Sequence, residues 1–357
     1  MLYPERHILS KSTFVRSSQC LKSLFLYKNH FDLRDPISPS QQMLFRRGTD
    51  IGTLAQGIFP GGVDASPKDH YSYQDSVAKT KQFLADGAEI IYEAAFQFDG
   101  VLAALDILVK NNGKWYAYEV KSAAKVSGAY ILDAALQYYV ITNSGLPLAN
   151  ISIINLNTDY VKDGSLELRK LFKSNSVFND VINKQKQVKL KIAAAKQVLA
   201  DKVLPEISIG KHCFEPYTCD FMGQCWKAVP AGSIFEIAGM QRTKQFEMYD
   251  CGLKMIKDIP GGFPLKAPQK LQVDFFQKLE PFIDKAGISK FLQKLQYPLY
   301  FMDFETFMPA VPVFDNTSPF QHLPFQYSLH FKKDKSAEAV HKSFLAEAGS
   351  DPCKAFL

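Results

Sequence analysis

The residues of this sequence best suited to chemistry are two acids and a lysine within positions 101–122, VLAALDILVKNNGKWYAYEVKS. Asp106 lies in one apolar stretch, and Glu119 and Lys121 lie in the next, with an Asn-Gly turn between the two stretches. Because side chains alternate across a strand, Glu119 and Lys121 project together while Val120 points into the core. An acid within an apolar strand is costly unless it has a partner. We therefore expect two carboxylates and an ammonium group to converge on one patch.

Such a patch is suited to metal chemistry. Carboxylate oxygens are the hard ligands that Mg²⁺ or Mn²⁺ prefers, and a lysine beside the ion can orient or acidify an attacking water. The alternative is that an acid-x-lysine pair marks only a solvated strand face, because exposed strands commonly carry charges. The flanking segments bear on this choice.

The order of these residues resembles the PD-(D/E)XK nuclease superfamily, whose motif is an acid, a spacer and then acid-x-lysine. Asp106, Glu119 and Lys121 fill the three positions. RecB-type members of the superfamily also carry a glutamate on the preceding strand, which matches Glu93, and a glutamine on the following helix, which matches Gln137. That glutamine is expected to support the site or to touch DNA. The resemblance implies a restriction-endonuclease-like α/β core surrounded by helices.

The same resemblance implies a role for each site residue. Asp106 and Glu119 would hold the metal together with the main-chain carbonyl of Val120, and Glu93 would hold or orient a second ion. Lys121 would position the hydrolytic water and steady the charge that develops on the phosphate. The expected reaction is therefore metal-dependent hydrolysis of phosphodiester bonds, as in a DNA exonuclease.

Two positions differ from the family pattern. Gln56 stands where many relatives carry a metal-binding histidine, and Ile141 stands where the tyrosine after the glutamine usually falls. These differences support a rival interpretation, a non-catalytic DNA-binding or scaffold module that retains the nuclease fold. The complete set of Asp106, Glu119 and Lys121 favours an enzyme, because a scaffold has no physical need for these groups together.

The cysteines provide an independent signal. Cys213, Cys219 and Cys225 are regularly spaced within HCFEPYTCDFMGQCW, and Cys20 stands alone near the N-terminus. The chain shows no signal peptide, so we expect the reducing cytoplasm, where cysteine clusters more often bind metal than form disulfides. Four thiolates suit a [4Fe-4S] cluster or a structural zinc, and the lack of any C-x-x-C pair favours the iron–sulfur cluster.

This set of four cysteines resembles the iron–sulfur variants of the RecB nuclease family, which occur in AddB-type subunits and CRISPR-associated exonucleases. A cluster that joins Cys20 to Cys213 would tie together two segments 193 residues apart (213 − 20) and remove much entropy of the unfolded chain. We interpret the two remaining cysteines, Cys251 and Cys353, as small buried hydrophobic residues.

A second acidic pair occurs in LYFMDFETF, where Asp303 and Glu305 lie two residues apart on a predicted strand and so share one face. This segment resembles the first motif of DnaQ-like (DEDD) 3′–5′ exonucleases, which have an RNase H-like fold. Those enzymes need two further aspartates and a histidine or tyrosine base, and this sequence continues for 52 residues after Glu305 (357 − 305). We therefore expect an incomplete second metal site, in a fragment or a vestigial domain. A DEDD exonuclease acting on RNA or DNA ends would need a longer chain.

Composition and organisation are consistent with these expectations. The net charge of +6 and pI of about 8.8 permit nucleic-acid binding without demanding it, and no apolar run is long enough to span a membrane. We expect a nuclease domain at 1–230 with a lysine-rich amphipathic helix at 184–202, a helical connector at 231–295, and an incomplete RNase H-like domain at 296–357.

The predicted partners follow from the resemblance. The whole arrangement is similar to a bacterial family that joins two nuclease folds in one chain, which implies DNA ends or single strands as substrate and protein partners from a repair or defence pathway. Arg46 and Arg47 lie upstream of the predicted site, where they could meet a phosphate backbone.

Overall fold

The hairpin expected at 101–122 is present in the computed structural model as β4 (Val101–Asn111) and β5 (Lys114–Lys121). The two turn residues, Asn112 and Gly113, have positive φ values of 49° and 74°. Asparagine and glycine reach this left-handed region at the lowest cost, and it matches the twist of a two-residue hairpin. The sequence prediction for this hairpin is therefore confirmed.

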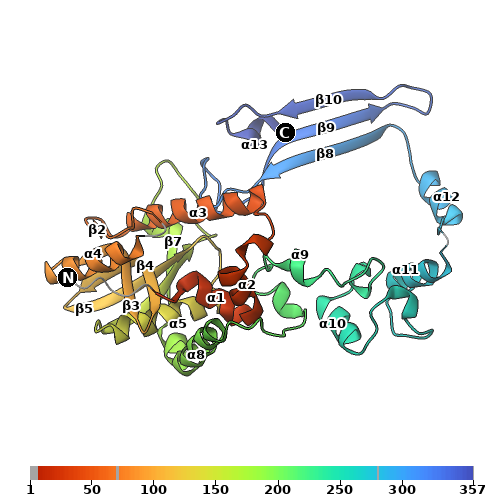
Figure 1. The fold of residues 1–357 in the computed structure, drawn as a ribbon. Coiled ribbons are helices and arrows are strands. Elements are labelled where there is room, and N and C mark those ends of the chain that lie inside the picture. The colour runs from red at the N-terminus through yellow and green to blue at the C-terminus, as the bar shows by residue number, and fades with distance from the viewer. Residues whose placement is uncertain (1–6, 70–71, 280, 357) are drawn as a thin grey trace. The chain divides into compact units, whose positions relative to one another are not determined.

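The structure describes residues 7–69, 72–279 and 281–356, and it divides into two units. The first unit holds the residues up to 207 together with 308–322, and the second holds 208–307 together with the residues from 323 onward. Both units mix helices and strands (Figure 1), so the predicted α/β class is confirmed at this level. The three domain ranges expected from the sequence remain predictions.

A mixed sheet of seven strands forms the first unit, with β4 at its centre. Strands β3, β4 and β5 are successively antiparallel, β6 runs parallel to β5, and β7 is antiparallel to β6. At the other edge β2 is parallel to β3, and β1 pairs in parallel with the start of β4. The strands outside the hairpin are β1 (Leu9–Ser10), β2 (Val63–Asp64), β3 (Ile90–Phe98), β6 (Leu148–Leu156) and β7 (Phe172–Ser176).

Helices cover both faces of this sheet (Figure 1). On one face, α5 (Gly128–Asn143) is apolar nearly all round and packs between the strands and α8 (Gln185–Asp201). On the other face, Ile51 and Ala55 of α3 (Pro39–Gln56) pack against the side chains of Ile107 and Val120. The remaining helices of this unit are α1 (Lys11–Gln19), α2 (Leu21–Asn29), η1 (Phe31–Leu33), α4 (Tyr73–Ala85), α6 (Leu168–Leu171) and α7 (Phe178–Asn183).

The segment 308–322 completes the core of the first unit although it lies far along the chain. Its Ala310 is buried in the same apolar cluster as Ile51 of α3. The main chains of Lys162 and Asn316 hydrogen-bond, and Lys162 forms an ion pair with Asp315. The sequence did not suggest this association, because the segment lies between two strands that belong to the other unit.

The second unit contains the cysteine-rich loop, a small helical cluster and a three-stranded sheet. Its helical part has its own apolar core, to which Ile234, Met248, Ile256 and Val273 contribute. The helices are η2 (Lys211–Cys213), α9 (Met222–Cys225), η3 (Ile234–Glu236), α10 (Arg242–Asp250), η4 (Ile256–Asp258), α11 (Ala267–Lys278), α12 (Lys285–Gln293) and α13 (Pro352–Phe356). The helical character expected at 231–295 is confirmed.

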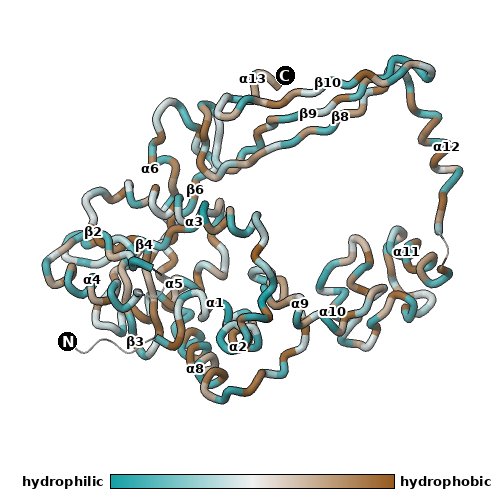
Figure 2. Tube along the Cα trace, turned by 45° about the horizontal axis from the view of Figure 1, so that its top comes forward, coloured by the Kyte–Doolittle hydropathy of each residue, from teal (hydrophilic) through white to brown (hydrophobic). Residues whose placement is uncertain are grey.

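The three-stranded sheet is antiparallel and has the order β10-β9-β8, with β8 (Leu299–Phe307), β9 (Leu323–Lys332) and β10 (Val340–Leu345). Strand β8 exposes several large apolar side chains, those of Tyr300, Phe301, Met302 and Phe304. Figure 2 shows the hydropathy of the residues along the trace, including this strand. Phe356 of α13 contacts Phe304 on one face of the sheet. None of the helices in the described ranges is both long and apolar enough to cross a lipid bilayer.

Candidate active site

Three acidic residues occupy opposed positions on the neighbouring strands β3, β4 and β5. The β3–β4 register places Glu93 opposite Asp106. Pairing between β4 and β5 ends at Ile107 and Tyr118, so Asp106 and Glu119 are the next opposed positions. The acids of the predicted motif therefore lie where these two strands stop pairing.

Within the described residues, one edge of β4 has no pairing strand over a short stretch next to this point. Because β3 pairs along one side of β4, both β1 and β5 must pair along the other side. There β1 reaches Leu102 and β5 begins at Ile107, which leaves a gap between them. The side chain of Lys11, the residue directly after β1, enters this gap and donates to the main-chain oxygen of Ala104 at 3.2 Å.

The carboxylate of Asp106 is held at the edge of the same gap. Its Oδ2 accepts a hydrogen bond from the main-chain N–H of Val120 at 2.5 Å. The family resemblance implied that the carbonyl of Val120 faces a metal, whereas the contact in the structure is made by the main-chain N–H of Val120. This bond fixes Asp106 against β5, one residue after Glu119.

The most enclosed acid of the site is Glu119, which is only 1% exposed. Its Oε1 accepts hydrogen bonds from Lys11 Nζ at 2.8 Å and from Lys121 Nζ at 2.6 Å. Its Oε2 accepts a bond from Gln137 Nε2 at 2.8 Å. Three residues expected at the site, Glu119, Lys121 and Gln137, are thus brought into direct contact.

Helix α5 contributes a further acid. Asp133 Oδ2 accepts a hydrogen bond from Lys121 Nζ at 2.6 Å, so this ammonium group joins two carboxylates. Asp133 precedes Gln137 by four residues, and residues with this spacing share one face of a helix. An acid in that position on an apolar helix was the signal that could have revealed Asp133. The sequence offered no comparable signal for Lys11.

Burial and mutual charge set the protonation of this cluster. Burial raises the pKa of Glu93 to about 7, and burial together with the negative charge of Glu119 raises the pKa of Asp106. Burial also opposes ionisation of Glu119, but the ammonium groups of Lys11 and Lys121 outweigh it and hold the pKa of Glu119 below its ordinary value. Two of the acids therefore favour the neutral form unless more positive charge is supplied.

Glu93 has an unusual backbone as well as a raised pKa. Its φ of 53° lies in the left-handed region, which residues other than glycine rarely adopt. Such a conformation costs on the order of 1–3 kcal/mol and is found mainly where function requires a particular direction of the side chain. Here it occurs at the strand position opposite Asp106.

A cavity of about 660 Å³ opens beside Glu93, Asp106 and Val120. One face of α3 lines it, and so does the loop after β2, which includes Lys68. The face of α3 includes Gln56 and two glycines one turn apart, Gly48 and Gly52, at which an added Cβ would meet open space. A ligand could therefore approach the helix backbone closely from this cavity.

The carboxylate oxygens of the cluster suit a hard cation, but in this structure lysine ammonium groups already occupy part of the site. Glu93, Asp106, Glu119 and Asp133 outnumber the two lysines, which leaves an excess of two negative charges when all are ionised. Buried oxygens of two α5 residues, Asp133 Oδ1 and Gln137 Oε1, also have no hydrogen-bond partner among the described atoms. Within the described ranges, however, no three His, Cys, Asp or Glu side chains are grouped to hold a metal. Ammonium groups occupy the oxygen of Glu119 that a cation would need.

The basic residues expected near DNA have different surroundings. Arg46 of α3 is exposed, whereas the guanidinium group of Arg47 lies 5.6 Å from the ring centre of Phe320. On α8, Val188 and Ile192 are buried in the core, and the lysines lie on the outer face except for contacts such as the ion pair of Lys196. The amphipathic helix predicted at 184–202 is confirmed.

The four cysteines expected to bind a cluster are divided between the two units. Cys20 lies between α1 and α2 in the first unit. In the second unit Cys213 is buried, and its main-chain oxygen accepts a hydrogen bond from the N–H of Cys219 at 2.8 Å. Cys225 ends the short helix α9. Their common cluster remains a prediction, whereas Cys251 proves to be exposed, so its interpretation as a buried residue was wrong.

The second acidic pair lies in open surroundings. Asp303 and Glu305 on β8 are both exposed, and across β9 they face Ser328 and Gln326. On β10 the same two rows continue with Ser343 and Leu345, so neither row contains a further carboxylate.

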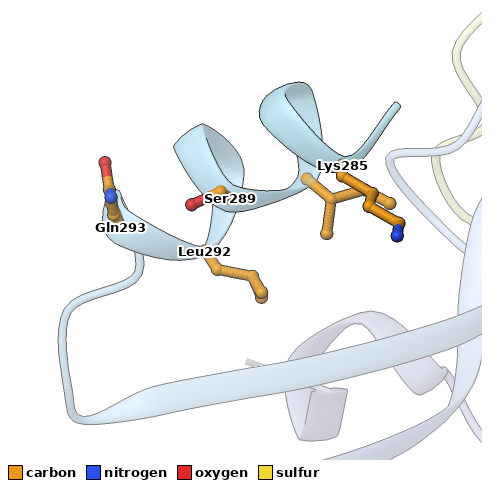
Figure 3. Close-up of a pocket in the computed structure, with 5 residues that line it drawn as sticks. Lys285, Ser289, Leu292 and Gln293 are labelled. Atoms are coloured by element: carbon orange, nitrogen blue, oxygen red, sulfur yellow. The ribbon is translucent and has the colours of Figure 1, made fainter. Parts of the chain in front are cut away.

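A second hollow, of about 510 Å³, lies on α12. It is lined by Lys285, Ile288, Ser289, Leu292 and Gln293, which all belong to one helix (Figure 3). It is therefore the exposed side of a helix and not an enclosed binding site.

Comparison with known proteins bears only on the C-terminal part. The family described as "Domain of unknown function (DUF2779)" matches residues 300–357, which contain most of the three-stranded sheet. No curated protein matches the chain at a significant level. The match leaves the sheet of the first unit and its buried acids outside its range.

Proposed function

We propose that this chain is a metal-dependent nuclease with a PD-(D/E)XK core of the RecB type, and that it acts as a DNA exonuclease in the cytoplasm. The observation that carries the proposal is the convergence of Asp106, Glu119 and Lys121 at the gap of a mixed α/β sheet. Gln137 of the following helix contacts Glu119 at the same place. A structural ion pair would not require further buried acids such as Glu93 and Asp106, because burial raises their pKa values and makes their ionisation costly.

Each residue has a role in the proposed reaction. Asp106 and Glu119 would hold Mg²⁺ or Mn²⁺, and Glu93 would hold or orient a second ion. The bound ion would lower the pKa of a water molecule and neutralise charge on the phosphate. Lys121 would orient that water and stabilise the negative charge that builds up on the phosphate oxygens. Gln137 would keep the Glu119 carboxylate in place.

The cavity beside the acids is the proposed entrance for the nucleic acid. Its volume of about 660 Å³ could admit a phosphodiester segment, and Gly48 and Gly52 would let the strand approach α3 closely. Arg46, which is exposed on the same helix, would contact the phosphate backbone outside the cavity. Ends or single strands of DNA are the proposed substrates, and proteins of a repair or defence pathway are the proposed partners.

The proposal includes an iron–sulfur cluster as a structural cofactor. Cys20, Cys213, Cys219 and Cys225 would supply four thiolates to a [4Fe-4S] centre, and zinc is the alternative occupant. The cluster would have a structural role and would take no part in hydrolysis.

One observation favours a second candidate function. In the part of the chain that the structure describes, the hydrogen bonds to the Glu119 carboxylate come from Lys11, Lys121 and Gln137, as expected for a structural network. A scaffold that binds DNA without cleaving it would account for this arrangement. Gln56, at the position where the resemblance predicts histidine, fits the same interpretation.

Cleavage of end-labelled single- and double-stranded DNA, with Mg²⁺, with Mn²⁺ and with a chelator, tests these alternatives. We expect cation-dependent cleavage that falls by about a hundredfold or more in Asp106→Asn and in Lys121→Met. Asp159→Asn is the matched control, because it removes an acid from a surface ion pair with Lys173. DNA binding without cleavage under every condition would favour the scaffold. Cleavage that survives Asp106→Asn but is lost in Asp303→Asn would move the active site to β8.

A further inference from the structure

Lys11 occupies the centre of the acidic cluster. Its Nζ is 2.8 Å from Glu119 Oε1 and 3.2 Å from the main-chain oxygen of Ala104. The nearby charges of Asp133 and Asp106 also act on this ammonium group. A carboxylate oxygen and a main-chain oxygen are the same kinds of ligand that a hard cation takes.

The position of Lys11 is not explained by the helix that carries it. It is the first residue of α1, directly after the N-cap Ser10, whose hydroxyl accepts the N–H of Thr13. A positive charge is unfavourable in the first turn of a helix, because the helix dipole is positive there. The acids across the gap therefore provide the attraction that holds this side chain inward.

Of the two lysines on Glu119, Lys11 is held less firmly. Lys121 also bonds Asp133 at 2.6 Å, and its ammonium group lies 5.4 Å from the ring centre of Tyr130. Among the described residues, Lys11 has besides Glu119 the long hydrogen bond to Ala104, and its side chain is 27% exposed against 18% for Lys121. If one ammonium group leaves the carboxylate, Lys11 can leave at the lower cost.

We propose that Lys11 is an internal counter-cation that competes with the divalent metal for Glu119. In the metal-free protein its ammonium group neutralises part of the acid cluster and keeps the site closed. Metal binding displaces the ammonium group from Glu119 Oε1 into the opening of the gap. This inference rests on the proposed function, and it adds a control of metal loading by the chain itself.

Metal affinity of the full-length protein is the first test. Binding of Mn²⁺ is measured by calorimetry, or by the loss of the free-ion electron spin resonance signal, for the unmodified chain and for Lys11→Met and Lys11→Gln. We expect roughly tenfold or greater tightening in both variants, because the competing state is removed. Lys196→Met is the matched control, since Lys196 is a lysine of similar exposure, 23%, paired with Asp99 on the surface.

Chemical reactivity of Lys11 is the second test and needs no variant. Limited acetylation followed by peptide mass spectrometry reports how available each lysine is. We expect Lys11 to react slowly without metal and severalfold faster with Mn²⁺, whereas Lys196 should be unaffected. This measurement separates displacement from a simple change in net charge, which could by itself tighten binding in the variants.

The outcomes distinguish this inference from the proposed function. Mn²⁺ binding that is equal or weaker in the Lys11 variants, with unchanged acetylation of Lys11, would overturn the role of Lys11 and leave the metal site intact. Absence of Mn²⁺ binding from the unmodified chain and from both variants would overturn the two proposals together. Binding only in the variants would support strong competition by Lys11.

Discussion

Two strands of this chain carry charged side chains at alternate positions, β5 in the first unit and β8 in the second. On β5, Glu119 is almost completely buried and Lys121 is partly buried, and each has charged partners within 3 Å. On β8, Asp303 and Glu305 are exposed and face neutral side chains on β9. By sequence alone, the two strands are equally suited to metal chemistry. In the structure they differ, because other elements bury the charged residues of β5 and leave those of β8 exposed.

The helices that cover the β5 cluster change how strongly its charges interact with one another. Helices α1 and α5 enclose the β5 cluster, where water cannot screen the acids, so each charge depends on its neighbours. Solvent screens the pair on β8, and its acids can be ionised without partners. Spacing along a strand therefore identifies candidate ligands, whereas burial decides whether they act as one electrostatic unit.

The largest effect is expected from removal of Glu119, the central acid of the buried cluster on β5, and it tests the difference between β5 and β8 most severely. Glu119→Ala would leave the ammonium groups of Lys11 and Lys121 without their shared partner, and breaking a buried ion pair typically costs about 3–5 kcal/mol. Urea unfolding should show a loss of this size, together with loss of cleavage. The matched substitution Glu305→Ala on β8 should cost less than about 0.5 kcal/mol. Equal losses at the two positions would remove the distinction between the strands.

Loss of the predicted iron–sulfur cluster should lower stability less than the removal of Glu119 does. Protein prepared without oxygen should be brown and contain about four irons per chain. Replacing Cys20, Cys213, Cys219 or Cys225 by alanine should bleach it and lower the free energy of unfolding by roughly 2–4 kcal/mol, through the loss of loop closure. Cys251→Ala is the control, because that side chain is exposed. A colourless preparation with stoichiometric zinc would contradict the prediction.

The pH dependence of stability provides a smaller, sharper test. The pKa of Glu93 is about 7 in the folded chain against 4.5 for an ordinary glutamate, so the folded state holds more protons between these values. Stability of the metal-free protein should therefore fall as the pH rises from about 4.5 to 7, by on the order of 1–2 kcal/mol once solvent screening is allowed for. Thermal unfolding measured across this range checks the slope.

The Glu93→Gln variant and added Mn²⁺ show whether the change of stability with pH comes from Glu93 or from other titrating groups. Glu93→Gln should flatten the pH dependence, because the neutral amide keeps the shape without the ionisable group. Saturating Mn²⁺ should also flatten it, since the ion stabilises the charged carboxylates. Glu167→Gln is the control at a surface ion pair with Lys170. A slope that is the same in Glu93→Gln would show that Glu93 is not its origin, and Asp106, whose pKa is also raised by burial, would then be the next residue to replace.

The sequence by itself determined the local elements and the type of residues at the site. The apolar stretch around Asp106 and the acid-x-lysine pair in the next stretch predicted β4 and β5, and Asn112-Gly113 predicted their turn. The resemblance placed Gln137 on the helix that follows these strands, and α5 carries it there. These features depend on neighbours a few residues away, so a sequence pattern carries them.

Only the tertiary structure decided how the site is enclosed and balanced. The contact of Lys11 with Glu119 joins residues 108 positions apart, and the gap that admits it arises because β1 and β5 pair with different parts of β4. The segment 308–322 joins the first unit across a larger separation, since the contact of Lys162 with Asp315 joins residues 153 positions apart. No local pattern records such associations, because they result from which buried surfaces and charges meet once the whole chain is packed.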